Sequence, residues 1–289
     1  MKKIFFLVLI LIYNSSISQT ISGNIIDSVS KSQIPFVNMV LLKHNIGGYS
    51  NEKGYYQLDI QRKLNDTLKV SSLGYKTKFI PLSNFKDKNI VDIFLIENNI
   101  NLEEVLIISK KIKYSKNIKL GLEQKGNIGV SSLAGHQYCT FVKNPYRKNG
   151  KLKSVIIKLK KRKKSKYTAS LRIHIYEYDE KEKKPKNELL LENVIIKAKN
   201  KKYSLIVDLQ KYNILFPKKG LCIGVEWIVS KTGLKKFTKI GPMLRYTYIN
   251  KIIPSWTNYQ NRGWKNGLMK YEGNKFAKPI LGIEVLMPK

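Results

Sequence analysis

The residues with the strongest potential for metal chemistry are His174 and Glu177, which lie three positions apart. A His and a Glu at this spacing are two of the zinc ligands of metallopeptidases. The run around them alternates between apolar and polar residues, so we expect a β-strand, in which such a pair points to opposite faces. A catalytic zinc usually takes three protein ligands, and no histidine follows His174. We therefore predict no metal site, and no residue pattern indicates a cofactor.

Hydrolytic chemistry is the alternative that the sequence leaves open. The chain has no G-x-S-x-G nucleophile motif and no P-loop. Asp and Glu are scarce, 20 residues against 54 Lys and Arg, and Glu226 and Glu177 are the carboxylates that we single out. Both could instead face solvent or pair with lysine. The sequence favours a non-enzymatic protein, with a hydrolase that uses a non-standard site in the second half of the chain as the alternative.

Aromatic side chains gather near the end of the chain, among glycines and asparagines. Trp256, Tyr259, Trp264 and Tyr271 lie in this stretch, together with Arg262. Aromatic planes stack on sugar faces, and a guanidinium donates hydrogen bonds to hydroxyl groups. These five residues are our predicted ligand-binding site, with an envelope glycan or a protein as the partner. The alternative is structural, in that the tryptophans close the open end of a β-domain.

The elements that position these residues are expected to be strands. In residues 155–159, 171–175, 205–209 and 221–227, apolar residues recur at every second position, as in strands with one buried face. About eight to ten such strands, joined by loops of mixed length, predict a jelly-roll-like β-sandwich over residues 121–289. Before it, residues 98–120 include a lysine-rich run that we interpret as a linker.

The first half carries the same signal over shorter strands. Between residues 20 and 97, apolar alternations are separated by turn residues, such as those at 51–54 and 73–76, and no helical period is present. An antiparallel sheet with one apolar face must cover that face with another sheet. About seven short strands therefore predict a small β-sandwich here.

Several motifs of this first half resemble a known family. They are SGNIID at 22–27 with IPFVNMV at 34–40, NEKGYY at 51–56, DTLKVSSLGYKT at 66–77 and LEEV at 102–105. Together they resemble the carboxypeptidase-regulatory-like domain of Bacteroidetes envelope proteins. The resemblance implies a transthyretin-like seven-stranded sandwich, which is a non-catalytic accessory domain. Residues 129–229 resemble β-regions of undefined role that follow this domain in the same bacteria.

The start of the chain has the features of a cleavable export signal. Residues 1–3 are basic, residues 4–13 are apolar but too few to span a bilayer, and small residues stand at 16 and 18. We predict a signal peptide at residues 1–18 and no transmembrane segment after its cleavage. The mature protein would then work in the periplasm, at the outer membrane or outside the cell.

The net charge of +34 bears on the chemical class of partner that the protein could bind. A basic surface attracts any polyanion, but the cations are overwhelmingly lysine, whereas arginine is the residue that reads bases and phosphates with a planar fork. An exported protein rarely meets nucleic acid, so we expect no nucleic-acid partner. Attraction to an anionic envelope or a polyanionic glycan stays open, as does a genome-wide preference for lysine at solvated positions.

The two cysteines, Cys139 and Cys222, both lie in apolar, strand-like runs. Export permits a disulfide between them, whereas buried free thiols are equally ordinary in a β-domain. The sequence decides neither this pairing nor the oligomeric state. Its features together predict an exported, non-enzymatic accessory or binding protein of the cell envelope.

Overall fold

The computed structural model describes residues 19–44, 46–60, 63–86, 88–98, 114–122, 126–130, 133–229, 238–250, 252–267, 269–270 and 275–289. Within these ranges the regular structure is β-strand, apart from two short 3-10 helices, η1 (Leu82–Phe85) and η2 (Gln210–Tyr212). The predicted all-β fold class is thus confirmed. No helix of the described part is long and apolar enough to cross a membrane. The predicted signal peptide and the motif at 102–105 lie outside the described residues.

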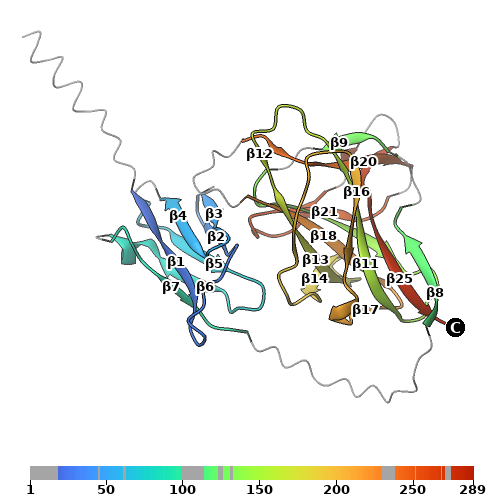
Figure 1. Ribbon diagram of the computed structural model, residues 1–289, viewed down its shortest axis with the longest axis horizontal. Coiled ribbons are helices and arrows are strands. Elements are labelled where there is room, and N and C mark those ends of the chain that lie inside the picture. The colour runs from blue at the N-terminus through green and yellow to red at the C-terminus, as the bar shows by residue number, and fades with distance from the viewer. Residues whose placement is uncertain are drawn as a thin grey trace, which may run out of the picture.

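The first domain is a sandwich of a three-stranded and a four-stranded sheet, with the orders β4–β1–β7 and β3–β2–β5–β6. It is drawn in blue to cyan in Figure 1. Apolar side chains of the two sheets share one core, which includes Ile21, Tyr56 and Leu68. The seven strands are β1 (Thr20–Asp27), β2 (Asn38–Leu41), β3 (Gly47–Tyr49), β4 (Tyr55–Asp59), β5 (Thr67–Ser71), β6 (Lys78–Pro81) and β7 (Ile93–Leu95).

The turn before β4 shows how the sequence determines this sandwich. The Asn51 side chain accepts hydrogen bonds from the backbone N–H groups of Lys53 and Tyr55, at 2.8 and 3.1 Å. Gly54 has a φ of +71°, in the left-handed region that glycine adopts without steric strain because it has no Cβ. After this turn, Tyr56 and Leu58 point into the core while their neighbours in β4 are exposed. The predicted turn at 51–54 and the alternation that follows it are therefore confirmed.

The second domain packs two larger sheets, with the main orders β14–β13–β18–β10–β21–β22 and β23–β24–β20–β11–β25–β8. It has more strands than predicted, because several short pairings of two or three residues extend the long ones. The strands are β8 (Tyr114–Leu120), β9 (Ile128–Val130), β10 (His136–Lys143), β11 (Gly150–Lys160), β12 (Tyr167–Thr168), β13 (Ser170–Asp179), β14 (Lys184–Glu188), β15 (Ile195–Lys197), β16 (Tyr203–Asp208), β17 (Leu215–Phe216), β18 (Gly220–Ile228), β19 (Ile240–Gly241), β20 (Met243–Ile249), β21 (Ser255–Tyr259), β22 (Lys265–Asn266), β23 (Met269–Lys270), β24 (Phe276–Pro279) and β25 (Leu281–Pro288).

The core of the second domain lies between these two sheets. Leu171, Ile173 and Ile175 of β13 are fully buried in it, as the sequence alternation predicts. Trp227 of β18 is also fully buried, and its Nε1 donates to the carbonyl of Pro242 at 2.9 Å. Because side chains alternate along a strand, the residues between these core positions must point to the opposite face of their sheet.

One part of the predicted linker is a strand. Residues 98–120 were expected to connect the domains, but Tyr114–Leu120 form β8 and pair with β25. Ile118 and Leu120 lie opposite Val285 and Ile283, and both pack against the core. The linker interpretation was wrong for this stretch. Two apolar residues at alternate positions are enough to form a strand when a neighbouring strand has backbone groups available for hydrogen bonding. The domain limits of 20–97 and 121–289 stay a prediction.

Candidate functional site at the domain interface

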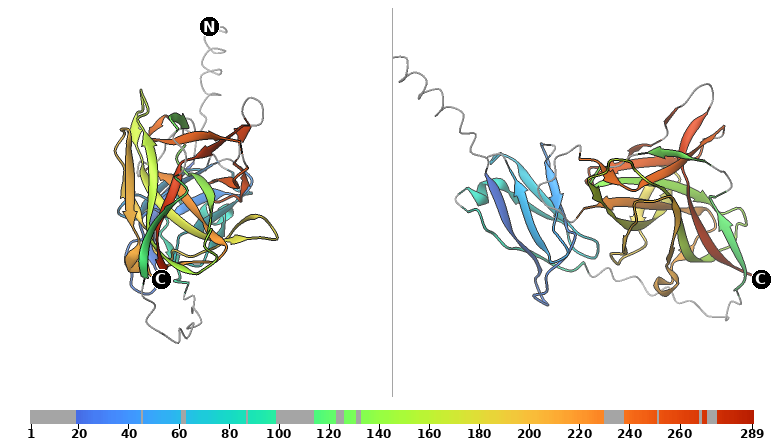
Figure 2. Two further views of the ribbon diagram at one scale, coloured as in Figure 1. Left: turned by 90° about the vertical axis from the view of Figure 1, so that its right-hand side faces the viewer. Right: turned by 45° about the horizontal axis from the view of Figure 1, so that its top comes forward.

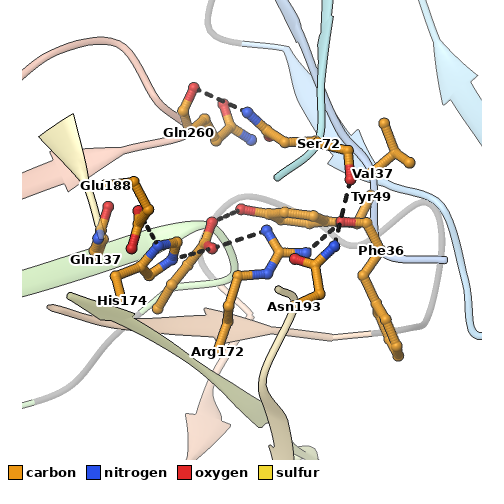
Figure 3. A network of polar contacts seen from close by, with 12 residues as sticks. Phe36, Val37, Tyr49, Ser72, Gln137, Arg172, His174, Glu188, Asn193 and Gln260 are labelled. Atoms are coloured by element: carbon orange, nitrogen blue, oxygen red, sulfur yellow. Dashed lines mark hydrogen bonds and ion pairs between the residues drawn. The ribbon is translucent and has the colours of Figure 1, made fainter. Parts of the chain in front are cut away.

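The outer face of the sheet that contains β13 and β18 carries a row of buried polar side chains. Arg172 of β13 lies opposite Glu226 of β18, which lies opposite Gln137 of β10. Gln137 is in turn opposite Asn258 of β21. All four side chains are buried, although they point away from the apolar core. Figure 2 shows the first domain beside this part of the second, and Figure 3 shows Gln137 and Arg172 of the row close to Tyr49 and Phe36 of the first domain.

Glu226 is the centre of the contacts between the domains. Its Oε1 accepts a hydrogen bond of 2.5 Å from the hydroxyl of Tyr49, which belongs to β3 of the first domain. Its Oε2 lies 3.2 Å from Nη1 of Arg172 and 3.2 Å from Nε2 of His174. Arg172 also donates through Nη2 to the carbonyl of Phe36 in the first domain, at 2.5 Å. One carboxylate and one guanidinium thus join the two sandwiches.

His174 lies between two carboxylates. Its Nδ1 is 2.9 Å from Oε2 of Glu188, while Nε2 faces Glu226. Glu188 is itself fixed, because its Oε1 accepts from the backbone N–H of Ile175 at 2.9 Å. The imidazole ring stacks on the ring of Tyr176, at 5.6 Å between centroids, and the Tyr176 hydroxyl accepts from Nε2 of Gln137. We call Tyr49, Gln137, Arg172, His174, Tyr176, Glu188 and Glu226 the interface network.

The pKa values within the interface network favour fixed charges. Burial alone would raise the pKa of Glu226, but Arg172, His174 and Tyr49 together lower it to about 2. Burial would lower the pKa of His174, but the two glutamates raise it to about 9. The pKa of Tyr49 is well above its ordinary value because of burial and the charge of Glu226. At neutral pH His174 is therefore a cation and Glu226 an anion, so neither of these two groups is poised to exchange a proton.

Further contacts join the domains at a second place. Nη2 of Arg262 donates to the carbonyls of Leu41 and His44 in the first domain, at 3.1 and 2.5 Å. Asn38 donates to the carbonyl of Gln260 at 3.4 Å. The loop after β21 therefore lies along β2 and the turn that follows it. The contact between the domains also includes Lys197 with Glu52, at 3.4 Å, and Asn193 with Ser72, at 3.5 Å.

Close packing around Tyr49 depends on a glycine of the second domain. A Cβ added to Gly135 would lie 3.0 Å from the Tyr49 hydroxyl oxygen and 2.8 Å from Cγ of Gln260. Gly135 also has a φ of +81°, which disfavours other residues. The backbone of the second domain can thus approach the tyrosine as closely as the hydrogen bond to Glu226 requires.

Four of the five predicted ligand-binding residues lie in the described part of the structure. Trp256 is buried against Cys139, Cys222 and Tyr176. Trp264 is half-buried and meets Tyr176 edge-on, at 5.3 Å between centroids.

The other two described residues, Tyr259 and Arg262, make different contacts. Tyr259 is half-buried and lies edge-on to the ring of His136. Arg262 donates a hydrogen bond to the carbonyl of Leu41 in the first domain. Tyr271 lies outside the described residues. Both tryptophans pack against other side chains of the second domain. Ligand binding at these five residues stays a prediction, as does closure of the open end of the β-domain.

The two cysteines pack against Trp256 and Tyr176 and belong to the neighbouring strands β10 and β18. Cys139 pairs with Gly224 and Phe141 pairs with Cys222, so the two thiols are diagonal neighbours on one face. Both are fully buried and free. Burial, together with contact to Cys222, raises the pKa of the Cys139 thiol well above its ordinary value. This thiol is therefore protonated and shielded.

Sequence reasoning found part of the interface network. His174 and Glu177 do not converge, since Glu177 accepts from the Asn187 side chain instead, and His174 shares a polar face with Arg172. The expectation that Glu226 faces solvent or pairs with lysine is wrong, because it pairs with Arg172 and His174. Glu188 and Tyr49 were missed. In the described part of the chain, no group of three His, Cys, Asp or Glu is placed to hold a metal ion.

Comparison with known proteins identifies the class of the first domain. Residues 21–107 match the family model of the CarboxypepD_reg-like domain, which confirms the resemblance predicted from the motifs. The match covers less than half of the chain, so it describes this domain and not the whole protein. No match to the chain is found among the curated proteins.

Two solved structures from Bacteroides uniformis are similar over most of the chain. One is a candidate carbohydrate-binding protein, 10% identical over 93% of this chain and 98% of that chain, with a TM-score of 0.21. The other is a DUF3823 family protein, 8% identical over 94% of this chain and all of the other, with a TM-score of 0.23. At TM-scores this low, the likeness carries no information about the function of this chain.

Proposed function

We propose that the protein is an exported, non-enzymatic accessory and binding protein of the cell envelope, in which two β-sandwiches act as one rigid body. The observation that carries this proposal is the interface network. Its carboxylates and imidazole meet in the way that a catalytic site would require. His174 and Glu226 are buried, Glu188 is half-buried, and each of these groups contacts a partner of opposite charge.

The chemistry of the interface network supports a structural role over catalysis. A general acid or base works best with a pKa near the pH of its surroundings. The pKa values of about 2 for Glu226 and about 9 for His174 are far from neutrality in opposite directions. The nearby Cys139 thiol is shielded from any base or substrate. We infer that the network holds the first domain against the second and leaves the outer surfaces free for a partner.

The first test compares the mature chain, residues 19–289, with its Glu226→Gln variant. Both are assayed for the release of reducing ends from polysaccharides and of amines from peptides. We expect no turnover by either protein. Turnover by the wild type that is lost in Glu226→Gln, with an unchanged fold by circular dichroism, would establish the hydrolase alternative and overturn the proposal.

Export is tested separately. The full chain, expressed with its own N-terminus in a Gram-negative host, should yield a periplasmic product whose mass corresponds to a start at Gln19. A chain with Leu7→Arg and Leu9→Arg, which interrupt the apolar run, should stay in the cytoplasm at full length. Recovery of full-length wild-type chain from the cytoplasm alone would contradict this part of the proposal.

A further inference from the structure

Three lysine-rich segments of the second domain meet at one end of the sandwich. They are the connection between β11 and β12 (161–166), the connection between β15 and β16 (198–202), and residues 238–239, which lead into β19. Lys166 donates its backbone N–H to the carbonyl of Lys239 at 2.9 Å, and β12 pairs with β19. Figure 1 shows β12 at this end of the domain. We call the exposed lysines of these segments the cationic tip: Lys161, Lys163, Lys164, Lys166, Lys199, Lys201, Lys202 and Lys239.

The segments of the cationic tip are held together by hydrogen bonds rather than by ion pairs. The Asn200 side chain accepts from the backbone N–H of Arg162 at 2.8 Å and donates to the Ser165 hydroxyl at 2.7 Å. Arg162 in turn donates through Nη1 to the carbonyl of Ile240 at 3.1 Å. Asn200 and Arg162 are both half-buried, so they fix the loops while the lysines stay in solvent. Two of these lysines also lie over tyrosine rings, Lys166 over Tyr167 and Lys201 over Tyr203.

The cationic tip differs from the lysine-rich hairpin between β13 and β14 in having no acidic residue. None of the three segments contains Asp or Glu. Within the described structure, none of the eight tip amines lies within 4.0 Å of a carboxylate. The hairpin between β13 and β14 is the contrasting case, because there Lys184 pairs with Glu182 and Lys186 with Asp179. A general preference for lysine explains the hairpin, but it does not explain a concentration of unpaired charge on anchored loops.

Fixing many like charges in one place costs free energy, which a ligand of opposite charge offsets. The three segments contribute none of the large apolar side chains that are exposed in the described structure. A membrane surface is usually bound by apolar insertion together with charge, so this end lacks one of the two contributions. Lysine binds carboxylate and sulfate groups as a point charge, without the planar geometry through which arginine recognises nucleic acid. These features favour a soluble, repeating anion.

We infer that the cationic tip binds a linear polyanionic glycan, whose carboxylate or sulfate groups pair with the exposed lysines. The inference deepens the proposed function and rests on it, because it names the chemistry of the partner that the rigid two-domain protein binds. The cationic tip includes none of the aromatic residues singled out in the sequence.

The experiment compares two variants of the mature chain that lose the same charge. The tip variant carries Lys163→Gln, Lys164→Gln, Lys201→Gln and Lys202→Gln. The control variant carries Lys181→Gln, Lys183→Gln, Lys184→Gln and Lys186→Gln in the β13–β14 hairpin. Each set includes one residue with positive φ, Lys164 at 53° and Lys183 at 48°, so backbone strain is matched as well.

Binding to polygalacturonate is measured by calorimetry at low and at moderate salt, with fully methyl-esterified pectin as the uncharged comparison. The wild type should bind polygalacturonate and not the ester. The tip variant should bind at least about tenfold more weakly, with a smaller salt dependence, because fewer counterions are released. The control variant should stay within about twofold of the wild type, since its lysines contribute only long-range attraction.

Three outcomes would overturn the inference. The first is no binding of polygalacturonate by the wild type, and the second is an equal loss in both variants, which would mean that charge acts diffusely. The third is binding of phosphatidylglycerol vesicles, but not of polygalacturonate, that depends on the tip lysines. A failure of the proposed function gives a different result, namely the release of reducing ends from polygalacturonate by the wild type.

Discussion

At the scale of single residues, Glu226 couples the two domains. Each of its oxygens is used, one by Tyr49 across the interface and the other by Arg172 and His174. An ion pair away from water contributes little net stability over apolar packing, but removing one member leaves a buried charge without a partner. The interface network is therefore favourable only when it is complete.

Replacing Glu226 with Gln should accordingly destabilise the protein by about 3 kcal/mol, because Arg172 and His174 lose their shared anion. Urea unfolding at pH 7, followed by fluorescence, measures the change. Glu177→Gln is the control, since Glu177 bonds only to the Asn187 side chain among the described contacts, and it should change the free energy of unfolding by less than about 0.5 kcal/mol. Equal effects of the two substitutions would show that the interface network contributes nothing specific.

The raised pKa of His174 makes a prediction about pH. Burial opposes the charge of this imidazole, yet Glu188 and Glu226 raise its pKa from 6.5 to about 9. A raised pKa stabilises the fold fully below the unfolded value of 6.5, and this contribution is lost as the pH rises through about 9. The free energy of unfolding of the wild type should thus fall between these pH values. His174→Gln should be less stable at pH 6 and should lack this fall. An identical pH profile in both proteins would contradict the assignment.

At the scale of elements, β8 shows how weak a strand signal can be. Its sequence is mostly lysine and polar residues, yet Ile118 and Leu120 reach the core while Lys119 faces outward toward Glu284. Pairing with β25 supplies the backbone hydrogen bonds that the short apolar pattern alone could not predict. The strand therefore forms through its neighbour rather than through its own propensity.

Hydrogen exchange measured by mass spectrometry tests this element. Peptides that cover residues 116–120 should exchange slowly, as expected for a paired strand. Ile118→Ser removes apolar contact with the core and should speed exchange in β8 by about tenfold or more. Lys116→Ser changes an exposed side chain of the same strand and should leave exchange nearly unchanged. Fast exchange of these amides in the wild type would mean that this stretch is a linker after all.

The sequence predicted the sandwiches because their signal is local. Alternation identified the buried residues of β4 and β13, and a glycine at a required turn identified the start of β4. The interface network has no such signal, because its members stand at 49, 172, 188 and 226, and only the register between strands brings them together. A polar residue at every second position of β13 showed that this face is not apolar. It could not show that another domain covers the face.

At the scale of the whole molecule, the two apolar cores are separate and the contact between the domains is polar. One core is built from strands β1–β7 and the other from residues of the second domain. Polar interfaces between domains usually permit movement. Here, however, hydrogen bonds join the domains at more than one place, through the buried pair of Tyr49 and Glu226 and through the partly buried contacts of Arg172 and Arg262. Contacts at more than one place oppose rotation of one domain against the other. We therefore expect a single preferred arrangement of the two domains.

Small-angle scattering of the mature chain tests this expectation. The wild type should give the same radius of gyration at low salt and at about 1 M salt, because buried pairs are screened far less than exposed ones. Tyr49→Phe combined with Arg262→Ala removes the hydrogen bond to Glu226 and both hydrogen bonds of Arg262 across the interface, and should increase the radius of gyration and broaden the distance distribution. Tyr55→Phe with Lys76→Ala changes the same kinds of residue in exposed or half-exposed parts of the first domain and serves as the control. The expectation would be contradicted if the scattering curve of the wild type could be fitted only with several arrangements of the two domains. In that case, a partner bound at the cationic tip would not constrain the first domain, and the two sandwiches would act independently.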